Sequence, residues 1–159
     1  KMRDRRLLPA LVAIVAAAGR PDFAPPSMSD EEAERVTTAA TGLLGDIARP
    51  GDQTVIATLM QLLNASNDRV SLAAAVALGQ IGAVEAGEPV VALTRRLLDK
   101  GELGAVARLA RALARIGDED ALIFLQTLAT QGQASGDKQM GYLATTAEES
   151  ARELGNRLM

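Results

Sequence analysis

The apolar positions of this chain recur in three similar stretches, which are residues 36–48, 70–82 and 105–117. In the second stretch, "VSLAAAVALGQIG", Val70, Ala74, Leu78 and Ile81 are separated by steps of 4, 4 and 3. This spacing places the four side chains on one face of a helix. The three stretches align position by position as Val36, Val70 and Ala105; Ala40, Ala74 and Leu109; Leu44, Leu78 and Leu113; Gly45, Gly79 and Ala114; and Ile47, Ile81 and Ile116.

A second apolar stripe follows each stretch at a constant distance. Its members are Ile56, Val90 and Leu125, then Leu59, Leu93 and Leu128, with Leu63 and Leu97 added in the first two repeats. A turn separates the stripes, so each repeat is predicted to be a pair of antiparallel helices. Because one pair cannot bury both of its faces, neighbouring pairs should stack. We expect one all-α domain over residues 1–159, with helix pairs at about 30–64, 67–99 and 103–131 and single helices at about 6–18 and 145–158.

Helix starts and irregular segments punctuate this pattern. "SDEE" (29–32) and "TAEE" (146–149) have the sequence of a capping box. Asp52 and Asp118 stand where second helices need an N-cap. The segments 19–30 and 130–145, rich in proline and in glycine respectively, are predicted to be loops. Loops of this kind either carry function or simply tolerate insertion, and both readings stay open.

The repeat resembles a known family. Residues 70–82 match the pattern V-x-x-A-A-x-x-L-G-x-I-G with one extra residue after Val70, and "DRRLLPAL" (4–11) is similar to the start of its second helix. These segments resemble the short HEAT-like repeats of the bilin (phycobiliprotein) lyases. The resemblance implies a right-handed α-α superhelix, an α-solenoid of three full helix pairs with a half-repeat at each end. We therefore expect a fragment of a longer protein, whose open ends would favour end-to-end self-association.

Composition limits the function classes. The chain is 48% hydrophobic and 23% charged, as in soluble globular proteins, but only 2% aromatic. A net charge of −3 and the lack of stacking side chains argue against nucleic acid as a partner. The sequence has no His and no Cys, which removes the common nucleophile, acid-base and metal-ligand sets. We predict no catalytic, cofactor-binding or metal-binding residue; the acidic "GDED" (117–120) is better explained as a helix start than as a cation site.

Two sets of residues are candidates for partner binding. In the family that the chain resembles, second helices line the concave face. Equivalent positions there hold Gln61, Arg95 and Thr130, with Arg96 beside Arg95, and the arginines could grip carboxylates of an acidic peptide. Thr58, Thr94, Thr127 and Gln131 lie alongside. A second set, Arg108, Arg111 and Arg115, follows one face of a first helix. In both sets the alternative is an ordinary solvated surface, and Phe124, which lies off the core stripe, is either a partner anchor or a packing residue.

These observations predict a non-catalytic protein-binding or scaffolding module. The alternatives are a bilin-lyase-like protein that handles a small molecule and a purely structural spacer. HEAT-like iron hydroxylases need His ligands, and HEAT-like DNA glycosylases fit poorly with a pI of about 5.0 and no Trp. The N-terminal "KMRDRRLLPALVAIVAAAG" has the composition of a signal peptide but no run of membrane-spanning length, and we interpret it as a folded helix. A cytoplasmic location is then favoured; a secreted or periplasmic one follows if that segment is a signal.

Overall fold

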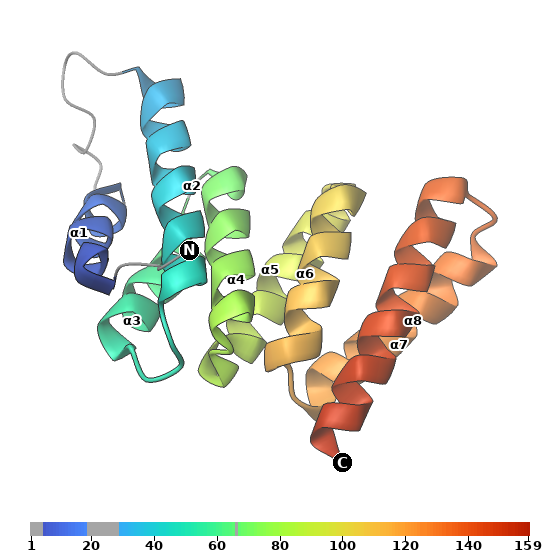
Figure 1. Ribbon diagram of the computed structural model, residues 1–159. Coiled ribbons are helices and arrows are strands. Elements are labelled where there is room, and N and C mark those ends of the chain that lie inside the picture. The colour runs from blue at the N-terminus through green and yellow to red at the C-terminus, as the bar shows by residue number, and fades with distance from the viewer. Residues whose placement is uncertain (1–4, 19–28, 66) are drawn as a thin grey trace. The chain divides into compact units, whose positions relative to one another are not determined.

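A computed structural model of the protein describes residues 5–18, 29–65 and 67–159. Every regular element in these residues is a helix, which confirms the all-α class (Figure 1). The chain divides into two compact units, Lys1–Gly82 and Ala83–Met159, and each is described by itself. The α-helices of the first unit are α1 (Leu8–Ala18), α2 (Asp30–Ile47), α3 (Gln53–Leu62) and α4 (Asp68–Ile81). Those of the second are α5 (Gly87–Asp99), α6 (Leu103–Ile116), α7 (Glu119–Ala134) and α8 (Lys138–Leu158).

In the first unit, α1 packs against α2 and α3, and α4 packs against both α2 and α3. The N-terminal apolar segment is helical from Leu8, after a 3-10 turn at Arg5–Leu7. Leu11 and Val15 of α1 are buried, which agrees with a folded helix there. Arg5 joins the turn between α2 and α3, because its guanidinium donates to the Ile47 carbonyl at 3.3 Å and pairs with Asp52 at 2.9 Å.

The two predicted apolar stripes form the core. Their members are buried in both units, from Leu44 and Ile47 in α2 to Leu125 and Leu128 in α7. Val36, with 40% of its surface exposed, and Ala105, which is half-buried, are the exceptions. Small residues allow helices to approach closely: a Cβ added at Gly45 of α2 would lie 3.0 Å from the Ala77 Cα of α4.

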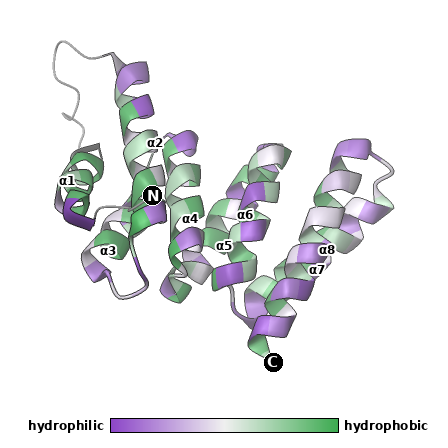
Figure 2. Cartoon of the chain, viewed as in Figure 1, coloured by the Kyte–Doolittle hydropathy of each residue, from purple (hydrophilic) through white to green (hydrophobic). Residues whose placement is uncertain are grey.

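In the second unit, α5 packs on α6, and α8 packs on both α6 and α7. A 3-10 turn, Val84–Ala86, precedes α5. Figure 2 shows hydrophobic and hydrophilic residues alternating along α6, as expected of a helix with one buried and one exposed face. Arg157 of α8 donates to the carbonyl of Gly117, the residue that follows α6. A positive charge at this position stabilises the C-terminal end of α6.

The helix starts agree with the sequence at three of four positions, Ser29, Asp52 and Asp118. Ser29 and Glu32 form the predicted capping box of α2, and Asp118 accepts from the Ala121 amide at the start of α7. Asp52 precedes α3, but its carboxylate makes no capping bond to that helix. It accepts instead from the Arg49 amide and the Arg5 guanidinium, so it ties the turn to the segment before α1.

The predicted loop over residues 130–145 is wrong. α7 continues to Ala134 and α8 begins at Lys138, so only residues 135–137 are non-helical. The prediction took the glycines of this segment as loop residues, but Gly132 lies inside α7 at its contact with α8. A Cβ at this position would lie 2.7 Å from the Ala144 Cβ, so the close packing of the two helices requires a glycine. Only Gly136 needs a glycine conformation, with φ of 73° in the turn.

The second predicted capping box is also wrong. Thr146 lies inside α8, where its hydroxyl donates to the Tyr142 carbonyl one turn earlier. The N-cap of α8 is Asp137, whose carboxylate accepts from the Gln139 amide at 2.8 Å. Of the other predicted loop, 19–30, residues 19–28 lie outside the described residues, and Ser29 and Asp30 begin α2.

Candidate protein-binding surface

A groove of about 650 Å³ lies between α5 and α7. Residues 100–102 reverse the chain from α5 into α6, and residues 117–118 reverse it again into α7. α5 and α7 therefore run in the same direction, with their N-terminal ends at the same end of the groove. We call this the α5/α7 groove. The residues that line it are Glu88, Val91, Ala92 and Arg95 from α5, and Asp118, Asp120, Ile123, Phe124, Thr127 and Gln131 from the α7 side.

Arg95 and Phe124 meet across the α5/α7 groove. The guanidinium carbon of Arg95 lies 5.3 Å from the centroid of the Phe124 ring, within the range of a cation–π interaction. The ring is half-buried and the arginine is exposed. In the described part of the chain, no carboxylate forms an ion pair with Arg95. Phe124 thus holds the arginine in place while its charge stays available to a ligand.

Three carboxylates stand at the N-terminal end of the groove. Glu88 lies in the first turn of α5, and Asp118 and Asp120 lie at the start of α7. Negative charge is favourable at these helix ends because the backbone dipoles are positive there. The α5/α7 groove is therefore negative at one end and positive about two helical turns further along.

Apolar surface joins the two charged regions. Ile123 is 60% exposed and Ala92 is exposed, above a buried Val91. A large aliphatic side chain exposed beside a hollow gains free energy when a partner covers it, at roughly 25 cal/mol per Å². The groove therefore has an apolar middle and polar or charged borders.

Within the second unit, the structure places Arg95 and Thr130, which the sequence aligned in one row, in two different hollows. Gln61 is exposed on α3 in the first unit, and Arg95 lies in the α5/α7 groove. Arg96 is half-buried, does not line that groove and has an interaction of its own. Thr130 lines a different hollow, because each helical residue turns by about 100° and Thr127 and Gln131 take the side that faces α5. Thr58 and Thr94 are buried, and their hydroxyls donate to carbonyls in their own helices.

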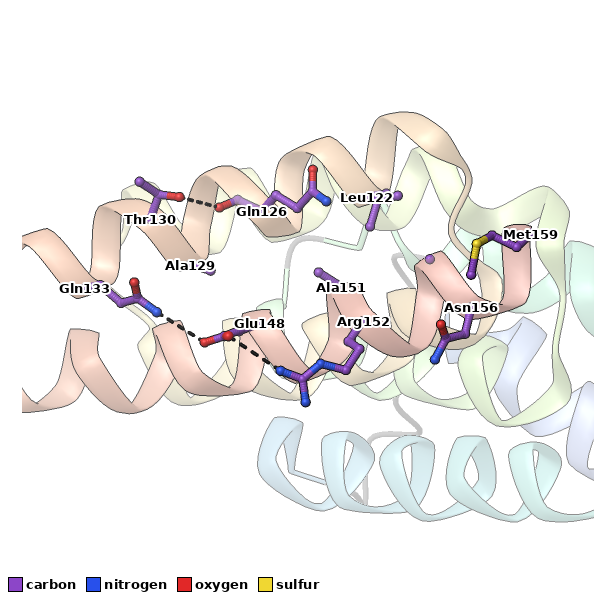
Figure 3. Close-up of a pocket in the computed structure, with 11 residues that line it drawn as sticks. Leu122, Gln126, Ala129, Thr130, Gln133, Glu148, Ala151, Arg152, Asn156 and Met159 are labelled. Carbon is purple, nitrogen blue, oxygen red and sulfur yellow. Dashed lines mark hydrogen bonds and ion pairs between the residues drawn. The ribbon is translucent and has the colours of Figure 1, made fainter.

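The hollow that holds Thr130 lies between α7 and α8 and also measures about 650 Å³. Figure 3 shows Gln133 of α7 beside Glu148 of α8, which in turn pairs with Arg152. The distances are 3.2 Å from Gln133 Nε2 to Glu148 Oε2 and 3.6 Å from Arg152 Nη2 to Glu148 Oε1. The polar groups here are therefore largely engaged with one another, unlike Arg95.

The arginine stripe of α6 is exposed, as the helical spacing predicts. Arg111 donates to the Tyr142 hydroxyl of α8 at 3.3 Å, while Arg108 and Arg115 point from the same helix face. The tyrosine itself is 61% exposed. This stripe carries one sign of charge on an exposed helix face.

Within the described residues, no cluster of acidic side chains has an arrangement that could hold a metal ion. The same residues contain no helix with both the length and the apolar composition to cross a bilayer. The pKa of Glu34 is lowered, chiefly by the hydrogen bond from Asn67, and Arg69 acts in the same direction. This contact joins α2 to the start of α4 and serves the fold rather than a site.

Paired helices with a shared apolar register define a helical repeat protein. Comparison with protein families matches residues 27–107, just over half of the chain, to HEAT repeats. The protein belongs to the HEAT-repeat family. No curated protein and no solved structure matches the chain. HEAT repeats generally mediate protein–protein interaction or scaffolding.

Proposed function

We propose that this protein is a non-catalytic protein-binding module and that its partner binds in the α5/α7 groove. One observation carries the proposal: the groove combines a charge held by an aromatic ring, Arg95 over Phe124, with the exposed aliphatic side chain of Ile123. Arginine is among the residues on which protein interfaces most depend, and exposed apolar surface beside it gains free energy when a partner covers it. The lack of His and Cys in the sequence supports a binding role rather than a catalytic one.

The charges of the groove change the partner chemistry expected from the sequence. Arg95 and Arg96 suggested an acidic peptide. Glu88, Asp118 and Asp120 would repel a uniformly acidic segment at one end of the groove, and Arg96 lies outside it. We therefore propose a partner segment of mixed charge, with an apolar middle.

The test is an affinity capture with the 159-residue chain as bait, read by mass spectrometry, followed by measurement of binding to each candidate partner. Arg95→Glu is the test variant. Arg108→Glu, an exposed arginine on α6, is the control with the same charge change. We expect a partner that binds the parent chain and the control and fails to bind Arg95→Glu. A partner that binds all three equally would place the binding site elsewhere, and no partner at all would favour a structural spacer.

The bilin-lyase subtype remains a proposal, supported by the repeat pattern of residues 70–82. The groove residues include no thiol that could attach a bilin covalently. We expect no gain of visible absorbance when the purified chain is mixed with a free bilin. A stable coloured complex would instead support small-molecule handling.

A further inference from the structure

The groove-facing stripe of α5 has a charge pattern that is complementary to itself. Glu88, Val91, Ala92 and Arg95 are separated by steps of 3, 1 and 3, so all four lie on one helix face. The acid and the base stand about 10.5 Å apart along the axis, because each residue rises by about 1.5 Å. The two small or apolar residues lie midway between them.

We infer that the segment that fills the α5/α7 groove is α5 of a second copy of this chain, lying antiparallel to the first; this inference rests on the proposed function of the groove. A two-fold axis between Val91 and Ala92 would bring Glu88 of each copy opposite Arg95 of the other. Each α5 would then lie in the groove of the other copy, which gives a closed, isologous contact.

The α7 side of the groove favours the same arrangement. Asp118 and Asp120 lie at the end of the groove where Glu88 stands, so they add attraction for Arg95 of the second copy. Ile123, which is 60% exposed, would be covered in part by Ala92 of the incoming α5, which is exposed. Antiparallel packing also sets the negative end of one helix dipole near the positive end of the other.

Two other helices, α6 and α3, fit the groove less well. The exposed stripe of α6 carries Arg108, Arg111 and Arg115, and this row would place like charges next to Arg95. α3 has no charged residue to pair with either end of the groove. α5 combines both signs of charge with an apolar middle at the spacing that the groove presents.

The test measures the mass of the full 159-residue chain in solution by analytical ultracentrifugation over a concentration series. We expect a reversible dimer in the parent chain. Glu88→Arg and Arg95→Glu should each weaken dimerisation by at least about tenfold, since both attractive pairs become repulsive. Glu153→Arg on α8 and Arg108→Glu on α6 make the same charge changes at exposed sites outside the groove and should leave the dimer unchanged.

Two rescue experiments make the inference specific. The double variant Glu88→Arg/Arg95→Glu restores opposite charges across the two-fold axis and should dimerise again, more weakly than the parent chain because the carboxylate at position 95 then faces Asp118 and Asp120. An equimolar mixture of the two single variants should form a heterodimer. In that mixture, the Glu88→Arg chain carries only positive charge at the two positions, and the Arg95→Glu chain carries only negative charge. Circular dichroism melts would first establish that each variant is folded.

The inference is overturned if the parent chain stays monomeric at every concentration, or if folded single variants dimerise as the parent does. Failure of both rescue experiments also overturns it. A monomeric parent chain whose capture of another protein depends on Arg95 would overturn self-pairing and leave the proposed binding function intact. Loss of both self-association and capture would count against both.

Discussion

Replacement of Gly132 by alanine should destabilise the second unit although it removes a glycine from a helix. Gly132 lies in α7 at its contact with α8. An added Cβ would lie 2.6 Å from the Met140 carbonyl oxygen and 2.7 Å from the Ala144 Cβ. Neither atom can rotate away, because one is backbone and the other is fixed directly to it.

The magnitude follows from two opposing effects. Carbon atoms pack best at about 3.5–4.0 Å, so the new methyl group would push α7 and α8 apart by roughly 1 Å. Overpacking of this kind costs about 1–3 kcal/mol. Two contacts under 3.0 Å, neither of them to a flexible side-chain end, place this site in the upper part of that range, at about 2–3 kcal/mol. The better helix propensity of alanine returns about 1 kcal/mol. The free energy of unfolding should therefore fall by about 1–2 kcal/mol, with a melting temperature about 2–8 °C lower.

Gly141→Ala is the matched control. Gly141 lies within α8, and a Cβ there would meet nothing within 4 Å, so this change should raise the free energy of unfolding by up to about 1 kcal/mol. Urea denaturation and thermal melts followed by circular dichroism would measure both variants. The reasoning is refuted if Gly132→Ala is as stable as the parent, or if the two variants shift stability in the same direction.

Three further changes test contacts that fix helix ends. The pKa of Asp52 is lowered from its ordinary value of 3.8, first by the hydrogen bond from Arg5 and then by that from the Arg49 amide. The ionised carboxylate therefore adds to the free energy of unfolding above that pH, and this contribution is lost as the pH falls below it. Arg5→Ala should raise the pKa of Asp52, as measured by NMR titration. Ser71→Ala should cost about 1–2 kcal/mol in urea melts, because its buried hydroxyl donates to the Leu62 and Ala65 carbonyls at the end of α3. Asp118→Ala should cost about 1 kcal/mol through loss of the α7 cap.

Each of these has a control and an opposing result. An unchanged Asp52 titration in Arg5→Ala would show that the Arg49 amide alone sets this pKa. Thr127→Ala removes an exposed hydroxyl that bonds only within α7 and should be nearly neutral beside Ser71→Ala. Asp120→Ala removes a carboxylate from the same helix start that makes no capping bond. An equal fall in the free energy of unfolding for Asp118→Ala and Asp120→Ala would contradict a specific capping role for Asp118.

The sequence was sufficient to predict the helix pairs, the core stripes and the family of this protein. Those features depend on periodicity along the chain: residues such as Leu78 and Ile81 share a face whatever else the fold does. The capping box at Ser29 was equally accessible, since its partners lie within one turn of each other. Local spacing sets these properties, and so they can be read from residues close in sequence.

Tertiary structure decided the features that depend on distances between helices. Gly132 looked like a loop residue and is a packing residue, because its neighbour Ala144 comes from another helix. Sequence alignment placed Arg95 and Thr130 in one row, but the rotation of α7 presents Thr127 and Gln131 to the α5/α7 groove instead. The sequence showed only that Arg95 and Phe124 each lie off the core stripe of their own helix. That pattern does not predict the contact between them. Periodicity specifies which face of a helix is buried, whereas the packing of one helix against another determines which exposed side chains form a site.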